Sequence, residues 1–414
     1  MSGLSPGIDS KIKAPAHVPP DMIRDYEIYY VAGNDKDTFN FLRTMHDDRD
    51  VFYNLRADPI ICPQGAWIVT SFKLMSEVFQ DPATFSNHDI VQYSKLVGES
   101  WSMIPVELDA PDHSRIRLLV MPMFAPARMK LLTSRISQRA EELIASFMTR
   151  GTCDFVAEFA SIFPVKIFLE LLDLPFSRFH DFIGWGNGII HSYIAEERTE
   201  ATRAARAYLR EVIGERRAQP GEDIISKIVQ SKTADGKALT DDELIGVVFM
   251  LFVGGLDTVA ATLGFAFRYL ADNAEARARL IREPDSVAVA VEHFLRAFSV
   301  VQTKRKVTRD VNFHGAPMKA GEYVTCVTGI ADTDPEEFGE GVQLEKAADR
   351  HVAFGLGPHR CLGSHLARLE LKIAIETFLR LIPNFDMVPG SKITTHGAGG
   401  VYGYDSLPLQ WTAE

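Results

Sequence analysis

The chain has 414 residues, of which 46% are hydrophobic and 24% are charged, and its formal net charge is −11. The length allows a large buried core, the composition excludes a fibrous or disordered protein, and the acidic balance argues against a nucleic-acid partner. The four cysteines are widely spaced and form no C-x-x-C pair, which argues against a disulfide scaffold and a zinc finger and fits a reducing cytoplasm.

The N-terminal segment contains no apolar run that could serve as a signal peptide or a membrane anchor. Prolines between Ala14 and Pro20 favour an extended segment over residues 1–22. No repeat and no low-complexity linker divides the rest of the chain. We therefore expect one domain over residues 1–414, in a soluble, cytoplasmic protein.

Helical periodicity dominates the chain between two regions with β signals. The first β signal is the run Gly65–Thr70, and the second is the Gly-rich stretch from Asn384 onward, which contains short strands. Apolar residues at spacings of three and four predict helices over Pro126–Phe147, Ala201–Ala218 and Asp285–Val300. This pattern predicts a mainly α protein with small β-sheets, of the α+β class.

One predicted helix is unusually long and apolar. It begins with a capping box formed by Thr240 and Glu243 and continues to about Leu270. Residues 244–256 carry no charge, but Asp257 interrupts the run before the roughly 20 apolar residues that a membrane span needs. We therefore expect this helix to pass through the centre of a large core.

The sequence F-G-L-G-P-H-R-C-L-G at residues 354–363 predicts an irregular loop that ends in Cys361, just before a helix that Pro383 stops. Unpaired N–H groups and the dipole at a helix start stabilise a thiolate. Gly357 and Gly363 would let the backbone approach a flat cofactor closely. Cys361 can alternatively be a small buried hydrophobe, and zinc is poorly supported because no second ligand pair is visible.

The centre of the long helix reads V-G-G-L-D-T at residues 253–258. Two glycines, an acid and an alcohol inside an apolar helix are unfavourable for stability, which indicates function. The glycines can open a groove beside a ligand, and Thr258 can bond a carbonyl one turn back and open the helix ladder. Asp257 then becomes a proton source connected to bulk water. The alternative is that Asp257 forms a buried ion pair.

Residues 354–363 match the haem-binding signature of the cytochrome P450 family, F-x-x-G-x-x-x-C-x-G, without a mismatch. Nearly the whole chain resembles this family, and it is similar to the bacterial camphor hydroxylase group. The resemblance implies the P450 fold, with the long central helix over haem b and the loop of its Cys361 thiolate ligand beneath it. It also implies that Asp257 and Thr258 deliver protons during oxygen activation. The other cofactor contacts that it implies are Gly254, Phe354 and the propionate-binding residues His113, Arg117, Arg305 and His359.

The chain departs from the family pattern at the nearly universal E-x-x-R motif. Arg296 is in place, but His293 stands three residues before it, and Glu292 is one position off and is expected to point elsewhere. A neutral imidazole lacks the charge and the bidentate geometry of a carboxylate. The loop that usually supplies a further arginine offers Lys346. This departure is expected to weaken haem retention or stability.

The expected substrate pocket is apolar. Trp101 occupies the place of the tyrosine that anchors a ketone in camphor hydroxylases, and an indole is bulkier and can donate one hydrogen bond but accept none, so camphor is disfavoured. The positions that match the pocket are Val91, Trp101, Met103, Met250, Val253, Val301 and Val401. Each taken singly is equally compatible with plain core. Together they favour a small terpenoid or norisoprenoid held mainly by shape.

By the same resemblance, the chain is predicted to be a monomeric haem-thiolate monooxygenase that inserts one atom of O2 into an unactivated C–H bond. Electrons would come from a [2Fe-2S] ferredoxin and its reductase, docked on Arg115, Arg117 and Arg360. No nucleic acid or membrane is expected as a partner. The alternatives are a peroxide-driven peroxygenase, which normally lacks the acid–alcohol pair, a non-enzymatic haem sensor or carrier, which would fit His293, and a helical protein without cofactor.

Overall fold

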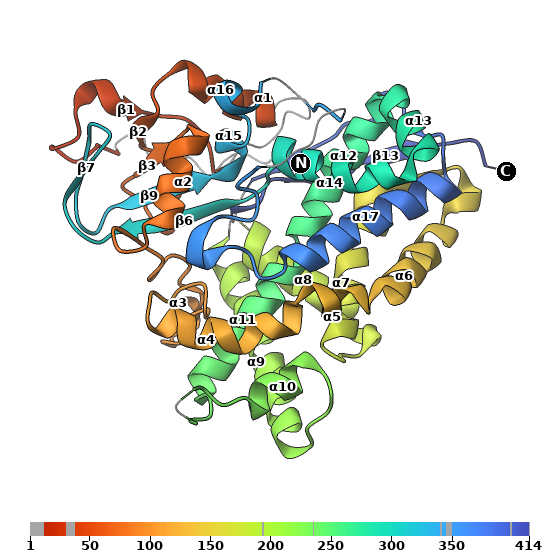
Figure 1. Cartoon of the computed structure of the whole chain (residues 1–414), viewed down its shortest axis with the longest axis horizontal. Coiled ribbons are helices and arrows are strands. Elements are labelled where there is room, and N and C mark those ends of the chain that lie inside the picture. Colours follow the sequence, from red (N-terminus) through yellow and green to blue (C-terminus); the bar gives the residue numbers. More distant parts are fainter. Residues whose placement is uncertain are drawn as a thin grey trace.

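The computed structural model describes residues 12–29, 38–192, 194–234, 236–339, 342–344, 350–397 and 400–413. Figure 1 shows the strands gathered toward one side of the molecule and the longer helices filling the remainder. The mainly α architecture with small sheets that the sequence predicts is confirmed. Lys346 lies outside the described residues.

The α-helices are distributed along the whole described chain. They are α1 (Thr38–Arg43), α2 (Phe72–Gln80), α3 (Tyr93–Leu96), α4 (Asp112–Val120), α5 (Pro126–Lys130), α6 (Thr133–Ala145), α7 (Phe163–Leu171), α8 (Phe179–Gly186), α9 (Ala195–Ala218), α10 (Ile224–Gln230), α11 (Asp241–Leu256), α12 (Thr258–Asp272), α13 (Ala274–Arg282), α14 (Val287–Ala297), α15 (Thr328–Ala331), α16 (Pro335–Phe338) and α17 (Ser364–Leu381).

Within the described residues, the strands are short and form four separate sheets. They are β1 (Ile23–Arg24), β2 (Val51–Asn54), β3 (Ala66–Val69), β4 (Phe85–Ser86), β5 (Thr152–Asp154), β6 (Gln302–Val307), β7 (Val311–Phe313), β8 (Ala316–Met318), β9 (Tyr323–Val327), β10 (Asp386–Met387), β11 (Thr395–His396), β12 (Gly403–Tyr404) and β13 (Pro408–Gln410). The largest sheet has the order β1-β2-β3-β9-β6-β4, and the others are β10-β13-β5, β11-β12 and β7-β8. All residues of β2 and β3 are buried, as expected of strands covered on both faces.

Two predicted helices differ from the observed elements at their boundaries. The stretch predicted over residues 126–147 divides into α5 and α6, because the helix is interrupted at Leu131, whose side chain is 78% exposed. The helix predicted over residues 285–300 is the shorter α14, which follows a 3-10 turn at Pro284–Ser286. The periodicity of the apolar residues predicts where these helices lie but not where they end, because local hydrogen bonding determines the ends of a helix.

The long central helix is broken rather than continuous. The capping box of Thr240 and Glu243 is present at the start of α11, but Asp257 has φ −117° and separates α11 from α12. The hydroxyl that bonds a carbonyl one turn back belongs to Thr262, which donates to the Thr258 carbonyl oxygen at 2.8 Å. This corrects the expectation of one helix opened by the Thr258 hydroxyl.

The α11–α12 pair is apolar and long enough to cross a membrane, but 67% of its most apolar window is buried inside the fold. Gly255 of this pair lies against α7, where an added Cβ would be 2.7 Å from the Phe168 ring. Close packing of α11 on α7 therefore requires glycine at this position. These contacts identify α11 and α12 as central core helices, in agreement with the interpretation from the sequence.

Candidate functional site

The loop that carries Cys361 is closed by its own backbone. The Cys361 N–H donates to the Phe354 carbonyl oxygen at 2.7 Å, and Gly357 has φ +68°. An added Cβ at Gly357 would lie 2.6 Å from the Phe79 carbonyl oxygen, so both conformation and space require glycine there. All four cysteines are described and are free, and Cys361 is the exposed one, whereas the others are buried.

The electrostatics around Cys361 are balanced between burial and positive charge. Cys361 is exposed as a residue, but the protein atoms around its sulfur desolvate the thiolate and so raise the pKa of Cys361, while an N–H of Gly363 and the guanidinium groups of Arg117, Arg360 and Arg368 act to lower it. The helix-start donor that the sequence predicts is present, but burial has the larger effect. A metal ion that bound the thiolate would displace this proton.

Four of the predicted cofactor contacts lie together beside this loop. His113 and Arg117 come from α4, Arg305 from β6 and His359 from the 3-10 turn Gly357–His359. The rings of His113 and His359 have centroids 4.1 Å apart. Burial lowers the pKa of His359 to about 3, with further contributions from His113, Arg305 and Arg117, so this imidazole is neutral.

Arg305 is the strongest indication that this cluster binds an anion. Its side chain is buried, and its Nη1 donates to the Lys304 carbonyl oxygen at 2.7 Å and to the Thr303 hydroxyl at 3.4 Å. No ion pair joins Arg305 to a carboxylate among the described residues, and of the acids only Asp109 acts on its pKa. His113 Nε2 is also buried without a hydrogen-bond partner in this part of the chain. A buried guanidinium without a carboxylate partner is costly, so the cluster fits the propionates of haem.

The two glycines of α11 have different surroundings. An added Cβ at Gly254 would meet no atom within 4 Å, whereas one at Gly255 would meet Phe168. Gly254 therefore faces open space, and Gly255 serves helix packing. The expectation that both glycines open a groove is corrected at Gly255.

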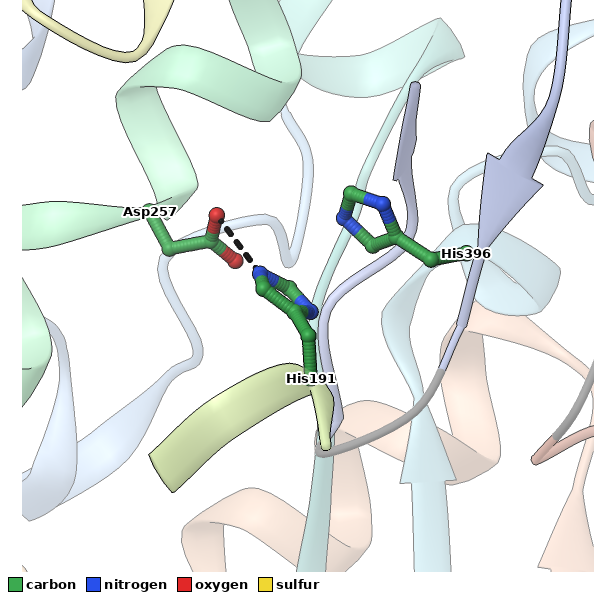
Figure 2. A group of neighbouring side chains, drawn as sticks. All are labelled: His191, Asp257 and His396. Atoms are coloured by element: carbon green, nitrogen blue, oxygen red, sulfur yellow. Dashed lines mark ion pairs between the residues drawn. The ribbon is translucent and has the colours of Figure 1, made fainter. Parts of the chain in front are cut away.

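Asp257 lies in the break between α11 and α12, where it pairs with His191 and lies near His396 (Figure 2). His191 Nε2 is 3.0 Å from Asp257 Oδ1, and His396 is the third member of the group. Burial acts to raise the pKa of Asp257, but His191 and His396 outweigh it and hold that pKa below its ordinary value. Asp257 thus pairs with a side chain of the protein, which was the alternative left open by the sequence, and its carboxyl is ionised at neutral pH. His191 and His396 had no sequence signal, because they lie far from Asp257 along the chain.

Val91 and Met103 are held by a carboxylate that sequence reasoning missed. The buried Glu107 accepts the Val91 N–H at 3.0 Å and the Met103 N–H at 2.8 Å. Because one side chain satisfies both backbone groups, it fixes two segments of the expected pocket wall. An acid in an apolar loop gives no spacing pattern that would have identified it.

The indole N–H of Trp101 is already engaged. Trp101 Nε1 donates to Glu99 Oε2 at 2.6 Å, and the same carboxylate binds Arg206 of α9. The Trp101 ring packs on Phe249, with centroids 4.9 Å apart. Trp101 therefore contributes an apolar surface here, and its hydrogen-bond donor serves the protein.

The seven expected pocket residues divide between two core clusters. Trp101 and Met103 belong to one cluster, with Val91, Met250 and Val253 packed against it. Val301 and Val401 belong to the other, where an isolated antiparallel bridge joins them. The structure therefore brings the residues together within each cluster, as two separate sets.

The altered E-x-x-R region contains compensating contacts. The buried Arg296 donates to the Asp332 carbonyl oxygen at 3.1 Å and lies 5.0 Å from the centroid of the Phe338 ring. Asp332 is fully buried, and burial raises the pKa of its carboxyl to about 7, although Arg296 acts to lower it. His293 is also buried. Asp332 thus places a titratable carboxyl near the guanidinium of Arg296, in a region where His293 replaces the usual glutamate.

Glu292 joins α14 to the Cys361 loop and to α17. Its carboxylate accepts from Arg368 Nε at 2.6 Å and Nη2 at 2.9 Å, and it lies 3.1 Å from His351 Nε2. Burial acts to raise the pKa of Glu292, but His351 and Arg368 outweigh it and hold the pKa at about 2. The Arg368 guanidinium in turn lies 4.6 Å from the centroid of the Phe354 ring. Glu292 thus points away from Arg296, as the sequence predicts, and it supports the loop of Cys361.

The three arginines expected to dock an electron donor differ in how far their charges are already paired within the protein. Arg115 is paired with Glu243 and lies 3.5 Å from Asp112, so its charge is largely neutralised. Arg117 Nη2 donates to the Arg360 carbonyl oxygen at 2.5 Å, and Arg360 is exposed. Arg360 is therefore the most available positive charge of the three.

Comparisons with known proteins agree with one another. A model of the family "Cytochrome P450" matches residues 165–294 and 289–396. The "Probable cytochrome P450 127A1" of Sinorhizobium fredii is 36% identical over 96% of both chains. The solved structure of cytochrome P450 CYP101C1 superposes with a TM-score of 0.86 at 30% identity, over 97% of this chain and 100% of the other. The structure of CYP101J2 gives a TM-score of 0.85 at 30% identity, with the same coverage.

Proposed function

The chain belongs to the cytochrome P450 family, a family of haem-dependent monooxygenases, and we propose that it hydroxylates a small hydrophobic molecule of the terpenoid or norisoprenoid class. In the net reaction, one C–H bond, O2, two electrons and two protons give one C–OH group and one water molecule. Apolar residues supplied by both core clusters support a substrate held by shape. Camphor is disfavoured, because the N–H of Trp101 is bound to Glu99.

Haem b is the proposed cofactor, with Cys361 as its axial ligand and Gly254 and Phe354 beside it. His113, Arg117, Arg305 and His359 would hold the propionates. The observation that carries this assignment is the buried Arg305 guanidinium, which has no carboxylate partner among the described residues. When bound, the haem supplies the chemistry of O2 activation, and the protein orients and shields it.

Asp257 and Thr258 are proposed to move protons from solvent. The Asp257 side chain is 17% exposed and ionised, so it can accept a proton and release it inward. Thr258 follows it as the first residue of α12. This pair favours turnover with O2 over a peroxide-driven reaction, which needs no proton delivery.

A [2Fe-2S] ferredoxin with its reductase is the proposed electron source for a cytoplasmic, monomeric enzyme. Arg360 offers positive charge for an acidic partner, and Arg117 lies beside it. Leu118 is 65% exposed and Met121 is 46% exposed at the same end of α4, so apolar contacts flank the charge. An apolar patch rimmed by charge is typical of a protein interaction site.

The experiment is a screen of terpenoids and norisoprenoids for the low-spin to high-spin shift of the haem absorption band. We expect at least one compound to give a saturable shift and then to be hydroxylated with NADH, a ferredoxin and its reductase. Saturable binding without any oxygen consumption would support a haem sensor or carrier instead. Product formation with hydrogen peroxide at rates above those with the ferredoxin system would support a peroxygenase.

A further inference from the structure

His191, Asp257 and His396 come from three separate elements and point toward one another (Figure 2). His191 ends the π-helical turn Asn187–His191, Asp257 lies in the break between α11 and α12, and His396 ends β11. One ligand atom from each side chain lies within 4.8 Å of the other two, and the two imidazole centroids are 4.0 Å apart. The side chains are 16%, 17% and 16% exposed in the order of the chain.

An ion pair between His191 and Asp257 explains only part of this arrangement. Asp257 Oδ2 and His396 Nε2 are both buried and have no hydrogen-bond partner among the described residues. A buried acceptor left without a partner costs about 1–3 kcal/mol. Two such atoms in one group indicate a ligand that binds both.

The second imidazole is prepared for metal binding by its own partner. His396 Nδ1 lies 2.7 Å from Asp405 Oδ1, and with the proton on Nδ1 the lone pair of Nε2 faces the group. Gly403 makes room for this ring, since an added Cβ would lie 2.5 Å from His396 Nε2. A carboxylate behind a ligating histidine is a usual arrangement in zinc sites.

We propose that His191, Asp257 and His396 form a binding site for a divalent transition metal ion, with Zn²⁺ as the ion it takes. Two imidazoles and one carboxylate are the ligands that zinc prefers, and three protein ligands leave a fourth position for water. Zinc bonds of 2.0–2.2 Å hold ligand atoms roughly 3.3 Å apart, so the group must contract by about 1.5 Å at most.

The site has a consequence that rests on the proposed function. Bound zinc would hold the carboxylate of Asp257, which is the group proposed to relay protons to the reaction centre. Zinc is therefore expected to slow product formation while substrate binding stays intact. Binding of the ion itself does not depend on that function and can be measured separately.

The test uses the haem-loaded, full-length protein, freed of affinity tags and treated with a chelator, in calorimetric titration with ZnCl2. We expect one saturable site, weakened at least tenfold in His396→Ala and unchanged in His314→Ala. His314 is the matched control because it is an exposed histidine with a single carboxylate partner, Glu77, at 2.8 Å. Equal affinities of the wild type and His396→Ala, or no saturable binding, would overturn the proposal.

Asp405→Asn gives a second test that keeps all three ligands. It removes the charge behind His396, and the loss of such a partner typically lowers metal affinity by a factor of about 10 or more. In crystals soaked with zinc, an anomalous peak at the zinc edge is expected between the three side chains, and a peak only elsewhere would refute the site. If zinc binds at the site but leaves NADH-driven turnover unchanged, the proton role of Asp257 is wrong and the metal site stands.

Discussion

Cys361 and Asp257 each lie just before a helix, α17 and α12, but the groups that surround them have different origins. Around Cys361, the Phe354 carbonyl, the Gly363 N–H and the Arg360 guanidinium come from one stretch of ten residues, and only the charges of Arg117 and Arg368 are added from α4 and α17. Around Asp257, the partners come from residues 191 and 396. The environment of Cys361 is encoded mainly by neighbouring residues and that of Asp257 is assembled by the fold, which is why only the first can be recognised as a motif.

The largest effect is expected from removal of the locally encoded ligand. Cys361→Ala should abolish the red-shifted Soret band of the reduced, carbon-monoxide-bound protein and reduce hydroxylation to background, because no other sulfur can replace it. Cys153→Ala, which removes a buried sulfur in β5, is the control and should retain the band. A persistent red-shifted band in Cys361→Ala would show that the ligand lies elsewhere.

The next largest effect is expected beside Asp257, whose environment is assembled by the fold. Thr258→Ala should preserve the spin shift on substrate binding but lower the product formed per NADH by roughly tenfold or more, as expected when proton transfer is impaired. Thr262→Ala is the matched control, since its hydroxyl lies one turn further along α12 and bonds the Thr258 carbonyl. Unchanged coupling in Thr258→Ala would contradict the role proposed for this residue.

The fold class, the central apolar helix and the loop of Cys361 can be predicted from the sequence, because each depends on local periodicity or on residues within one motif. The break at Asp257 cannot, since a single polar residue in an apolar run does not reveal whether the helix continues. Glu107 was missed for a related reason: its backbone partners at Val91 and Met103 adjoin it only after folding. Motif matching located Trp101 but could not show that Glu99 occupies its N–H.

Glu292, which is distant from Cys361 in the sequence, also supports the Cys361 loop through Arg368. Its removal tests how far this loop depends on long-range contacts. Glu292→Gln breaks the ion pairs to Arg368 and His351 and should lower the free energy of unfolding by on the order of 2 kcal/mol at neutral pH. Because the folded-state pKa of about 2 lies below the ordinary value of 4.5, the carboxylate stabilises the fold above pH 4.5, and this contribution is lost as the pH falls toward 2.

Urea denaturation of the wild type and Glu292→Gln at several pH values measures this difference. The two stability curves should approach each other as the pH falls from 4.5 toward 2. Glu376→Gln is a suitable control, because Glu376 pairs with Lys372 on the exposed face of α17 at 3.4 Å. A gap between wild type and Glu292→Gln that stays constant with pH would mean that charge is not the cause.

The smallest effect is expected from restoring the family carboxylate. In His293→Glu, the new side chain lies one turn before Arg296 on α14 and can pair with its guanidinium, but Asp332 already places a carboxyl nearby. Haem content per chain should therefore stay the same or rise slightly, with stability changed by about 1 kcal/mol or less. His293→Gln separates charge from shape, since a gain that appears in both variants cannot come from an ion pair. Loss of haem in His293→Glu alone would show that the histidine has become a required part of this buried network.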